Sequence, residues 1–257
     1  MLWYKSWLET RSRFLIGLLV MMFAAAGTVI AYPKVMQLMP LADTLDTSAS
    51  GELGRRIKEG VELAREYRGY VWAQWIRQSF VQMGTLFAVL LGSGGLRSHT
   101  SGGAALFTLS MPVSRSRVLG IRAATGLAEL LALVLLPALL MPLMSPTVGQ
   151  SYSVADAAVH GACLFVAGAV FFHLALLLST VFSDLWRPLL IACGVAVVLG
   201  LCEAVVRGQW TYGIFRTMSG EDYFRTGHLP WLGLLASTAA SAVMLYGATK
   251  TLSRKDF

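Results

Sequence analysis

Charged residues are scarce in this chain. Only 14% of its 257 residues are Asp, Glu, Lys or Arg, whereas 56% are hydrophobic. A soluble domain carries about a quarter charged residues, so this deficit favours lipid as the solvent. Cysteine is also scarce: Cys163, Cys193 and Cys202 lie in apolar runs without CxxC spacing. The sequence therefore supports neither a disulfide framework nor a metal site.

Catalytic and nucleotide-binding motifs are missing as well. The sequence contains no GxxxxGK[ST] loop, no HExxH and no GxSxG, and its four histidines are scattered over different segments. It also lacks a basic cluster interleaved with stacking aromatics, which argues against a nucleic-acid partner. We expect the chain to bind no cofactor and to catalyse no reaction itself. Any energy for its action must come from another chain or from an ion gradient.

Six apolar runs are long enough to cross about 30 Å of hydrocarbon. The second run is interrupted by Gln74, Arg77, Gln78 and Gln82, so five spans are the alternative if that run lies at the interface. The first run is about 19 residues long, which favours a retained span over a cleaved signal peptide. The predicted fold is all-α, with spans near 14–32, 71–91, 119–144, 157–182, 188–206 and 230–249.

The distribution of basic residues predicts the orientation. With the N-terminus inside, the inner side holds eleven Lys and Arg against three acidic residues, whereas the outer side holds nine of each sign. Because cytoplasmic loops carry the excess of Lys and Arg, both termini are predicted to be cytoplasmic. The formal net charge of +7 thus reflects membrane topology. The expected location is a bacterial inner membrane.

Three segments outside the spans have a predicted form. Residues 1–13 combine tryptophans with charges and are typical of an amphipathic helix at a membrane surface. The outer segment 33–70 begins with prolines, and from Gly51 onward its apolar residues recur at three- and four-residue steps, which predicts an external helix running into the second span. The aromatic connection 207–228 is expected to dip into the outer interface as a pair of short helices.

Charged and titratable residues inside the spans are candidate functional residues, because each charge costs roughly 2.5–3.5 kcal/mol at a helix centre. Counting residues along the spans puts Arg77 and Glu129 at similar depth, which predicts a structural pair between the second and third spans. His173 is expected to be a hydrogen-bonded core residue. Glu203, near the outer end of its span, is expected to reach water by snorkelling.

The cytoplasmic segment 97–118 separates the second and third spans. It predicts a short helix with Leu106 and Leu109 on one side, a break at Pro112, and a basic start to the third span with Arg115, Arg117 and Arg122. These arginines are expected at phospholipid headgroups or against an acidic partner. This order resembles the loop signature of permeases of the type-two export superfamily of ATP-binding-cassette (ABC) transporters. The matching residues are Gly103, Leu106, Leu109, Ser110, Pro112, Val113, Ser114, Arg115 and Arg122.

The resemblance implies a permease subunit that pairs with a second, identical or related, permease and with two cytoplasmic ATPase subunits that bind ATP. By that resemblance His99–Met111 is a coupling helix docked on the ATPase, and the N-terminal helix supports it. An outer hairpin before the last span is also similar to that family. The family's acidic positions hold His99 and Ser101 here, and Ala104 stands at its threonine. The residues implied to contact the ATPase are His99, Gly103, Leu106, Leu109, Pro112 and Arg115.

Two other functions remain as alternatives. An ion-coupled carrier or channel would need no ATPase and would use Arg77, Glu129 and His173 as its polar path. A membrane-embedded enzyme would need a cluster of His, Asp or Glu at one interface, which the sequence does not show. The transported substrate does not follow from the sequence.

Overall fold

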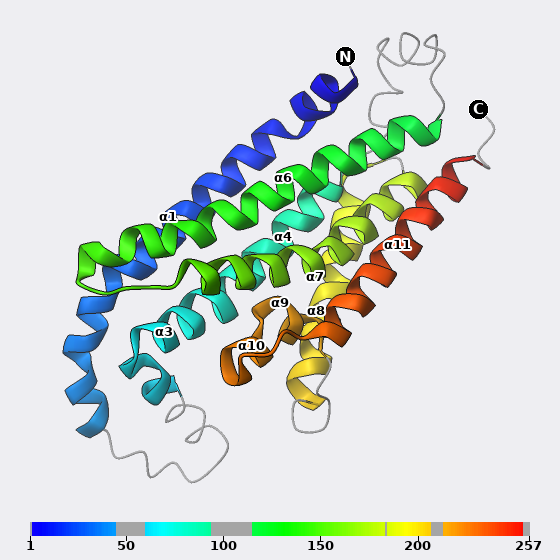
Figure 1. Ribbon diagram of the computed structural model, residues 1–257. Coiled ribbons are helices and arrows are strands. Elements are labelled where there is room, and N and C mark those ends of the chain that lie inside the picture. Colours follow the sequence, from blue (N-terminus) through cyan, green and yellow to red (C-terminus); the bar gives the residue numbers. More distant parts are fainter. Residues whose placement is uncertain (1, 45–59, 94–114, 183, 207–212, 254–257) are drawn as a thin grey trace.

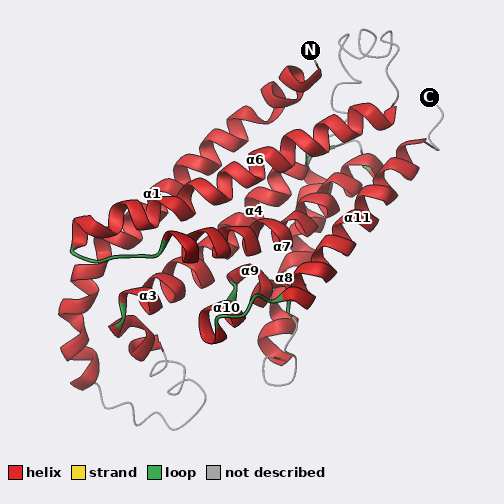
Figure 2. Ribbon diagram, viewed as in Figure 1, coloured by secondary structure: helices red, strands yellow, loops and turns green. Residues whose placement is uncertain are grey.

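The computed structural model describes residues 2–44, 60–93, 115–182, 184–206 and 213–253, and this part of the chain is helical apart from short turns, with no strand (Figures 1 and 2). Its elements, in chain order, are α1 (Leu2–Thr44), α3 (Tyr67–Tyr70), the π-helix η1 (Val71–Phe80), α4 (Val81–Gly92), α6 (Arg115–Met144), the 3₁₀-helix η2 (Ser145–Val148), α7 (Val154–Val181), α8 (Trp186–Val206), α9 (Ile214–Ser219), α10 (Glu221–Thr226) and α11 (Trp231–Ser253).

Five of the described helices are long and apolar enough to cross a membrane, which makes the chain a multi-pass helical membrane protein. The helix over residues 67–92, predicted as the second span, is not among them because its glutamines and Arg77 lower its hydropathy. Its crossing of the membrane stays a prediction. The five apolar stretches are Trp3–Met39, Ser116–Val148, Val154–Val181, Trp186–Val205 and Trp231–Ser253.

The long helices lie side by side in a slanted bundle with two distinct ends (Figure 1). We call one the loop end, because α4 finishes and α6 starts there, on either side of residues 94–114. The start of α1 and the finish of α11 lie at this same end. We call the other the hairpin end, because the short helices α9 and α10 lie there. Two short helices also stand where the sequence predicts a pair.

The first helix differs from its prediction. In place of a separate surface helix over 1–13 and a span ending near Tyr32, α1 is one continuous helix. No Pro or Gly interrupts its first fifteen residues, and its side chains pack on α6 from Thr10 onward. The helix also continues past Pro33, because proline removes only one backbone donor while Val35, Met36 and Met39 pack against the core.

The helix over residues 67–92 does not continue an external helix, as the sequence predicted, because the chain bends at Glu66. That residue is extended (φ −96°, ψ 134°), and residues 60–65 form a separate helical turn. A Cβ on Gly69 would lie 2.1 Å from the Leu63 carbonyl oxygen, so the close approach at this bend requires glycine. The external helix predicted from Gly51 lies mostly outside the described residues.

Helix α7 forms the centre of the bundle and packs on α4, α6 and α11. Its approach to α4 is tight: a Cβ on Gly92 would lie 2.3 Å from the Phe172 carbonyl oxygen. On the α6 side, a Cβ on Gly126 would lie 2.5 Å from the Phe172 ring. Close packing through small residues is how membrane helices associate when lipid is as apolar as their side chains. The polar ends of these helices are thereby held in fixed positions.

Candidate functional site

A polar cluster lies at the loop end, where three helices meet. Charged and hydroxyl side chains of α1 reach the last turn of α4 and the first half of α6 there. Buried charge in a membrane bundle is costly and marks candidate functional sites. We refer to this set as the loop-end cluster: Glu9, Thr10, Arg13, Ser93, Arg122 and Glu129.

The tightest contact in the loop-end cluster joins α1 to α6. The Thr10 hydroxyl donates a 2.6 Å hydrogen bond to Oε1 of Glu129, and the two residues are only 4% and 5% exposed. The second carboxylate oxygen of Glu129 is buried without a hydrogen-bond partner. Arg122 lies two helical turns earlier on α6, close enough for its charge to act on Glu129. Glu129 is therefore stabilised by one hydroxyl and one nearby cation.

Arg122 adds an ion pair between the same two helices. Its Nη1 lies 3.7 Å from Oε2 of Glu9, and the Arg122 side chain is 10% exposed. Its Nε atom has no hydrogen-bond partner. The pair is thus held by charge at a distance longer than a direct hydrogen bond. The sequence placed Arg122 at headgroups or against an acidic partner, and its acidic neighbour is Glu9 of the same chain.

Arg13 joins α1 to the end of α4. Its Nη1 donates to the carbonyl oxygens of Leu90, at 3.2 Å, and Ser93, at 2.5 Å. The last carbonyls of a helix have no partner within the helix and carry its negative dipole end, so an arginine there both satisfies and stabilises them. Ser93 is the last described residue before position 94. Arg13 therefore anchors the last described residue before the predicted cytoplasmic segment 97–118.

The loop-end cluster connects both flanks of residues 94–114 to one helix. Arg13 reaches the flank at Ser93, and Thr10 and Glu9 reach the flank formed by α6. These three residues of α1 lie within two turns of each other.

Most residues predicted to contact an ATPase lie outside the described part of the chain: His99, Gly103, Leu106, Leu109 and Pro112. Arg115 is the first residue of α6. Two turns further on, Arg122 turns into the bundle, whereas Arg117 is exposed. For the predicted loop, the structure therefore describes the two flanking helices, α4 before it and α6 after it.

The structure does not bring Arg77 and Glu129 together, so the predicted pair between the second and third spans is wrong. Glu129 contacts Thr10, whereas the Arg77 guanidinium lies 5.5 Å above the Trp72 ring. The depth count failed because α6 begins at Arg115 and is about 45 Å long at 1.5 Å per residue, well beyond the hydrocarbon thickness. Glu129 is level with Thr10 of α1, whereas Leu90 and Tyr70 bond Arg13 and Thr28 of α1, so Arg77, which stands between them, lies further from the loop end. His173 is buried and bonds the Ala169 carbonyl of its own helix at 2.7 Å.

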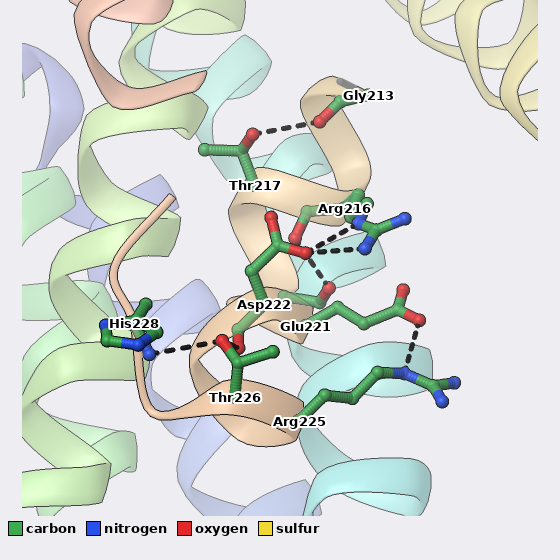
Figure 3. A network of polar contacts seen from close by, with 9 residues as sticks. Gly213, Arg216, Thr217, Glu221, Asp222, Arg225, Thr226 and His228 are labelled. Carbon is green, nitrogen blue, oxygen red and sulfur yellow. Dashed lines mark hydrogen bonds and ion pairs between the residues drawn. The ribbon is translucent and has the colours of Figure 1, made fainter. Parts of the chain in front are cut away.

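A second set of polar contacts lies at the hairpin end. Within the hairpin, Arg216 pairs with Asp222 and Glu221 pairs with Arg225, and the backbone N–H of His228 donates to the Thr226 hydroxyl (Figure 3). Glu203, which the sequence expected to snorkel to water, accepts instead from the Phe215 backbone N–H at 3.1 Å. Its carboxylate is favoured at the N-terminus of α9.

The hairpin is fastened to the bundle at the turn between α9 and α10. The Ser219 carbonyl accepts from Nε1 of Trp72 at 3.3 Å and from Nδ1 of His160 at 2.9 Å. Asp156 at the start of α7 accepts from Arg68, at 2.7 Å, and from the Tyr223 hydroxyl, at 3.0 Å. The hydrogen bond to Asp156 raises the pKa of Tyr223 above its ordinary value. The hairpin thus links α7 to the helix over residues 67–92.

Sequence reasoning missed Thr10, Arg13 and Ser93 as members of the loop-end cluster. All three are polar residues of types that are common in surface segments, and no local spacing reveals a contact between residues 10 and 129. The only signal was indirect: an arginine and two acidic residues inside apolar runs need partners.

Comparisons of the chain with protein-family models, curated proteins and solved structures find no match.

Proposed function

We propose that this chain is the permease subunit of an ABC transporter of the type-two export superfamily. It spans the membrane six times, pairs with a second permease, and takes its energy from separate ATPase subunits that bind ATP on the cytoplasmic side. The cytoplasmic side is the loop end, and residues 97–118 receive the ATPase. The chain itself contributes no catalytic residue and no cofactor site.

The loop-end cluster is the observation that supports this proposal. An ATPase-driven permease needs a cytoplasmic segment whose movement is passed to the spans. Here the flanks of residues 94–114 are joined to α1 by Arg13 on one side and by Thr10 and Glu9 on the other. A rigid helix of 43 residues can carry that displacement along the bundle. The proposal thereby gives the buried charges of α1 and α6 a mechanical role.

The ion-coupled alternative receives less support from the contacts. It needs Arg77, Glu129 and His173 to share a path, but the contacts described for them lead to different groups: the Trp72 ring, the Thr10 hydroxyl and the Ala169 carbonyl. A proton or ion relay requires groups within hydrogen-bonding reach or bridged by water. We therefore favour the ATPase-driven function.

The proposal is tested by co-purification with an ATPase that carries a GxxxxGK[ST] loop and is encoded by a neighbouring reading frame. The triple variant Leu106→Ala, Leu109→Ala and Arg115→Ala should lose at least about 90% of the bound ATPase. Truncating a few central apolar and arginine side chains removes most of the binding energy of a typical interface. The measurement is the ratio of ATPase to tagged permease after affinity purification from solubilised membranes.

A matched triple variant at the opposite end provides the control: Arg225→Ala, Leu232→Ala and Leu235→Ala, of which both leucines are largely exposed. It removes the same side-chain types and should retain the ATPase. Equal retention by both triple variants, with both chains folded, would rule out residues 97–118 as the docking segment.

A further inference from the structure

A row of glutamines lies exposed along the helix over residues 67–92. Gln74, Gln78 and Gln82 are spaced four residues apart, and all three are exposed. The opposite face of this helix is deeply buried, with Trp72, Trp75 and Phe80 at most 1% exposed. We call the three glutamines, together with the partly exposed Arg77 beside them, the glutamine stripe. It extends over no more than about 12 Å of helix.

The π-helix explains how this face is separated from the core. In an α-helix, residues five apart point in different directions, because 3.6 residues complete a turn. In η1, residues five apart come together: the Trp75 and Phe80 rings stack at 5.2 Å, and Arg77 lies over Trp72 at 5.5 Å. The wider turn gathers the aromatics on the bundle side and leaves the glutamines outside. Extended π-helical turns are rare and are frequent at functional sites.

The surface of the neighbouring helices is different at the same depth. Two hydrogen bonds, Tyr70 to the Thr28 carbonyl and Arg13 to the Leu90 carbonyl, set the helix over residues 67–92 beside α1. Between these two points, the exposed residues of α1 include Leu19 and Phe23, at 58% and 76%. The exposed residues of α8 between positions 190 and 205 are equally apolar. These surfaces suit lipid, whereas an exposed glutamine in hydrocarbon leaves its amide without partners, at a cost of several kcal/mol.

The glutamine stripe offers polar groups to whatever lies against it. The amides of the glutamines both donate and accept hydrogen bonds. Such a surface solvates water and hydroxyl groups better than it solvates apolar chains.

We propose that the glutamine stripe lines a water-filled part of the translocation path and that the transported solute is polar. This inference rests on the proposed function, because it takes the helix over residues 67–92 to be a membrane span. It adds a substrate class and a path-lining surface to that function.

The test uses single cysteines in a chain whose Cys163, Cys193 and Cys202 are replaced by alanine. Gln74→Cys, Gln78→Cys and Gln82→Cys should react with charged methanethiosulfonate reagents in membrane vesicles opened by freeze–thaw. Leu19→Cys and Phe23→Cys, at the same depth on α1, should react at least about tenfold more slowly, because a charged reagent is excluded from hydrocarbon. They should still react with the apolar reagent N-phenylmaleimide, which shows that they are exposed to lipid.

Two results would overturn the water-filled path. The first is failure of the charged reagents to modify any of the three glutamine positions. The second is equal reaction at the glutamine positions and at positions 19 and 23, which would put the whole region outside the hydrocarbon. Neither result depends on ATPase binding, so the inference and the docking of the ATPase fail separately.

Discussion

Replacing Arg122 with leucine is expected to lower the free energy of unfolding by about 3 kcal/mol, because it removes the cation that pairs with Glu9 and that lies two turns from the buried Glu129 carboxylate. Glu129→Leu should have a similar effect, since it removes the acceptor of Thr10 and leaves Arg122 with only the 3.7 Å contact to Glu9. The double variant Arg122→Leu and Glu129→Leu should recover most of the loss. Replacing both members of a buried charge pair by apolar residues removes the desolvation cost together with the attraction.

The measurement is the apparent melting temperature of each variant in detergent. Arg117→Leu is the matched control, because Arg117 is an exposed arginine on the same helix. It should change the stability by less than about 0.5 kcal/mol. If the double variant is as unstable as the two single losses added together, Arg122 and Glu129 do not act on each other and the loop-end cluster is not a coupled unit.

At the hairpin end, Gly220→Ala is expected to destabilise the chain more than Gly227→Ala does. Both glycines end a short helix in the left-handed region, at φ +62° and φ +76°, so alanine costs about 1–2 kcal/mol of backbone strain at each. Only at Gly220 would the added Cβ also meet another side chain, 2.7 Å from Nδ1 of His160. That contact would push the α9–α10 turn away from the Ser219 carbonyl's two donors, Trp72 and His160.

The difference between the two variants isolates the docking of the hairpin, because the backbone strain is common to both. The readouts are the melting temperature and the rate at which trypsin cleaves after Arg216 and Arg225, which lie in the two short helices. Gly220→Ala should be cleaved several times faster than Gly227→Ala. Equal stability and equal cleavage would mean that the turn does not need its contact with α7.

The apolar helices were predictable because long hydrophobic runs have no alternative to a helix in lipid. Helices α7, α8 and α11 lie within a few residues of their predicted bounds. The errors arose where a helix is not defined by hydropathy. Proline at position 33 suggests an end, yet α1 continues because its next turns pack on the core. The π-helix η1 leaves no mark in a periodicity of 3.6 residues.

The contacts of the candidate site were less predictable than the helices. Buried charges at positions 122 and 129 indicate that these side chains have polar partners. The sequence does not identify the partners, because they depend on how far each helix extends beyond the hydrocarbon. Glu129 accepts a hydrogen bond from a threonine of α1, and Glu203 accepts one from a backbone N–H of α9. Both contacts depend on three-dimensional packing. The first joins residues far apart in the sequence, and the second involves a segment predicted to lie at the surface.

The central claim is that an ATPase drives this chain through residues 97–118. The most direct test is the rate of ATP hydrolysis by the ATPase encoded beside it, measured alone and with the chain reconstituted in lipid. The proposal predicts a several-fold higher rate with the full chain, and the rate of the ATPase alone with the variant Leu106→Ala, Leu109→Ala and Arg115→Ala. Equal hydrolysis rates with and without the full chain would contradict it.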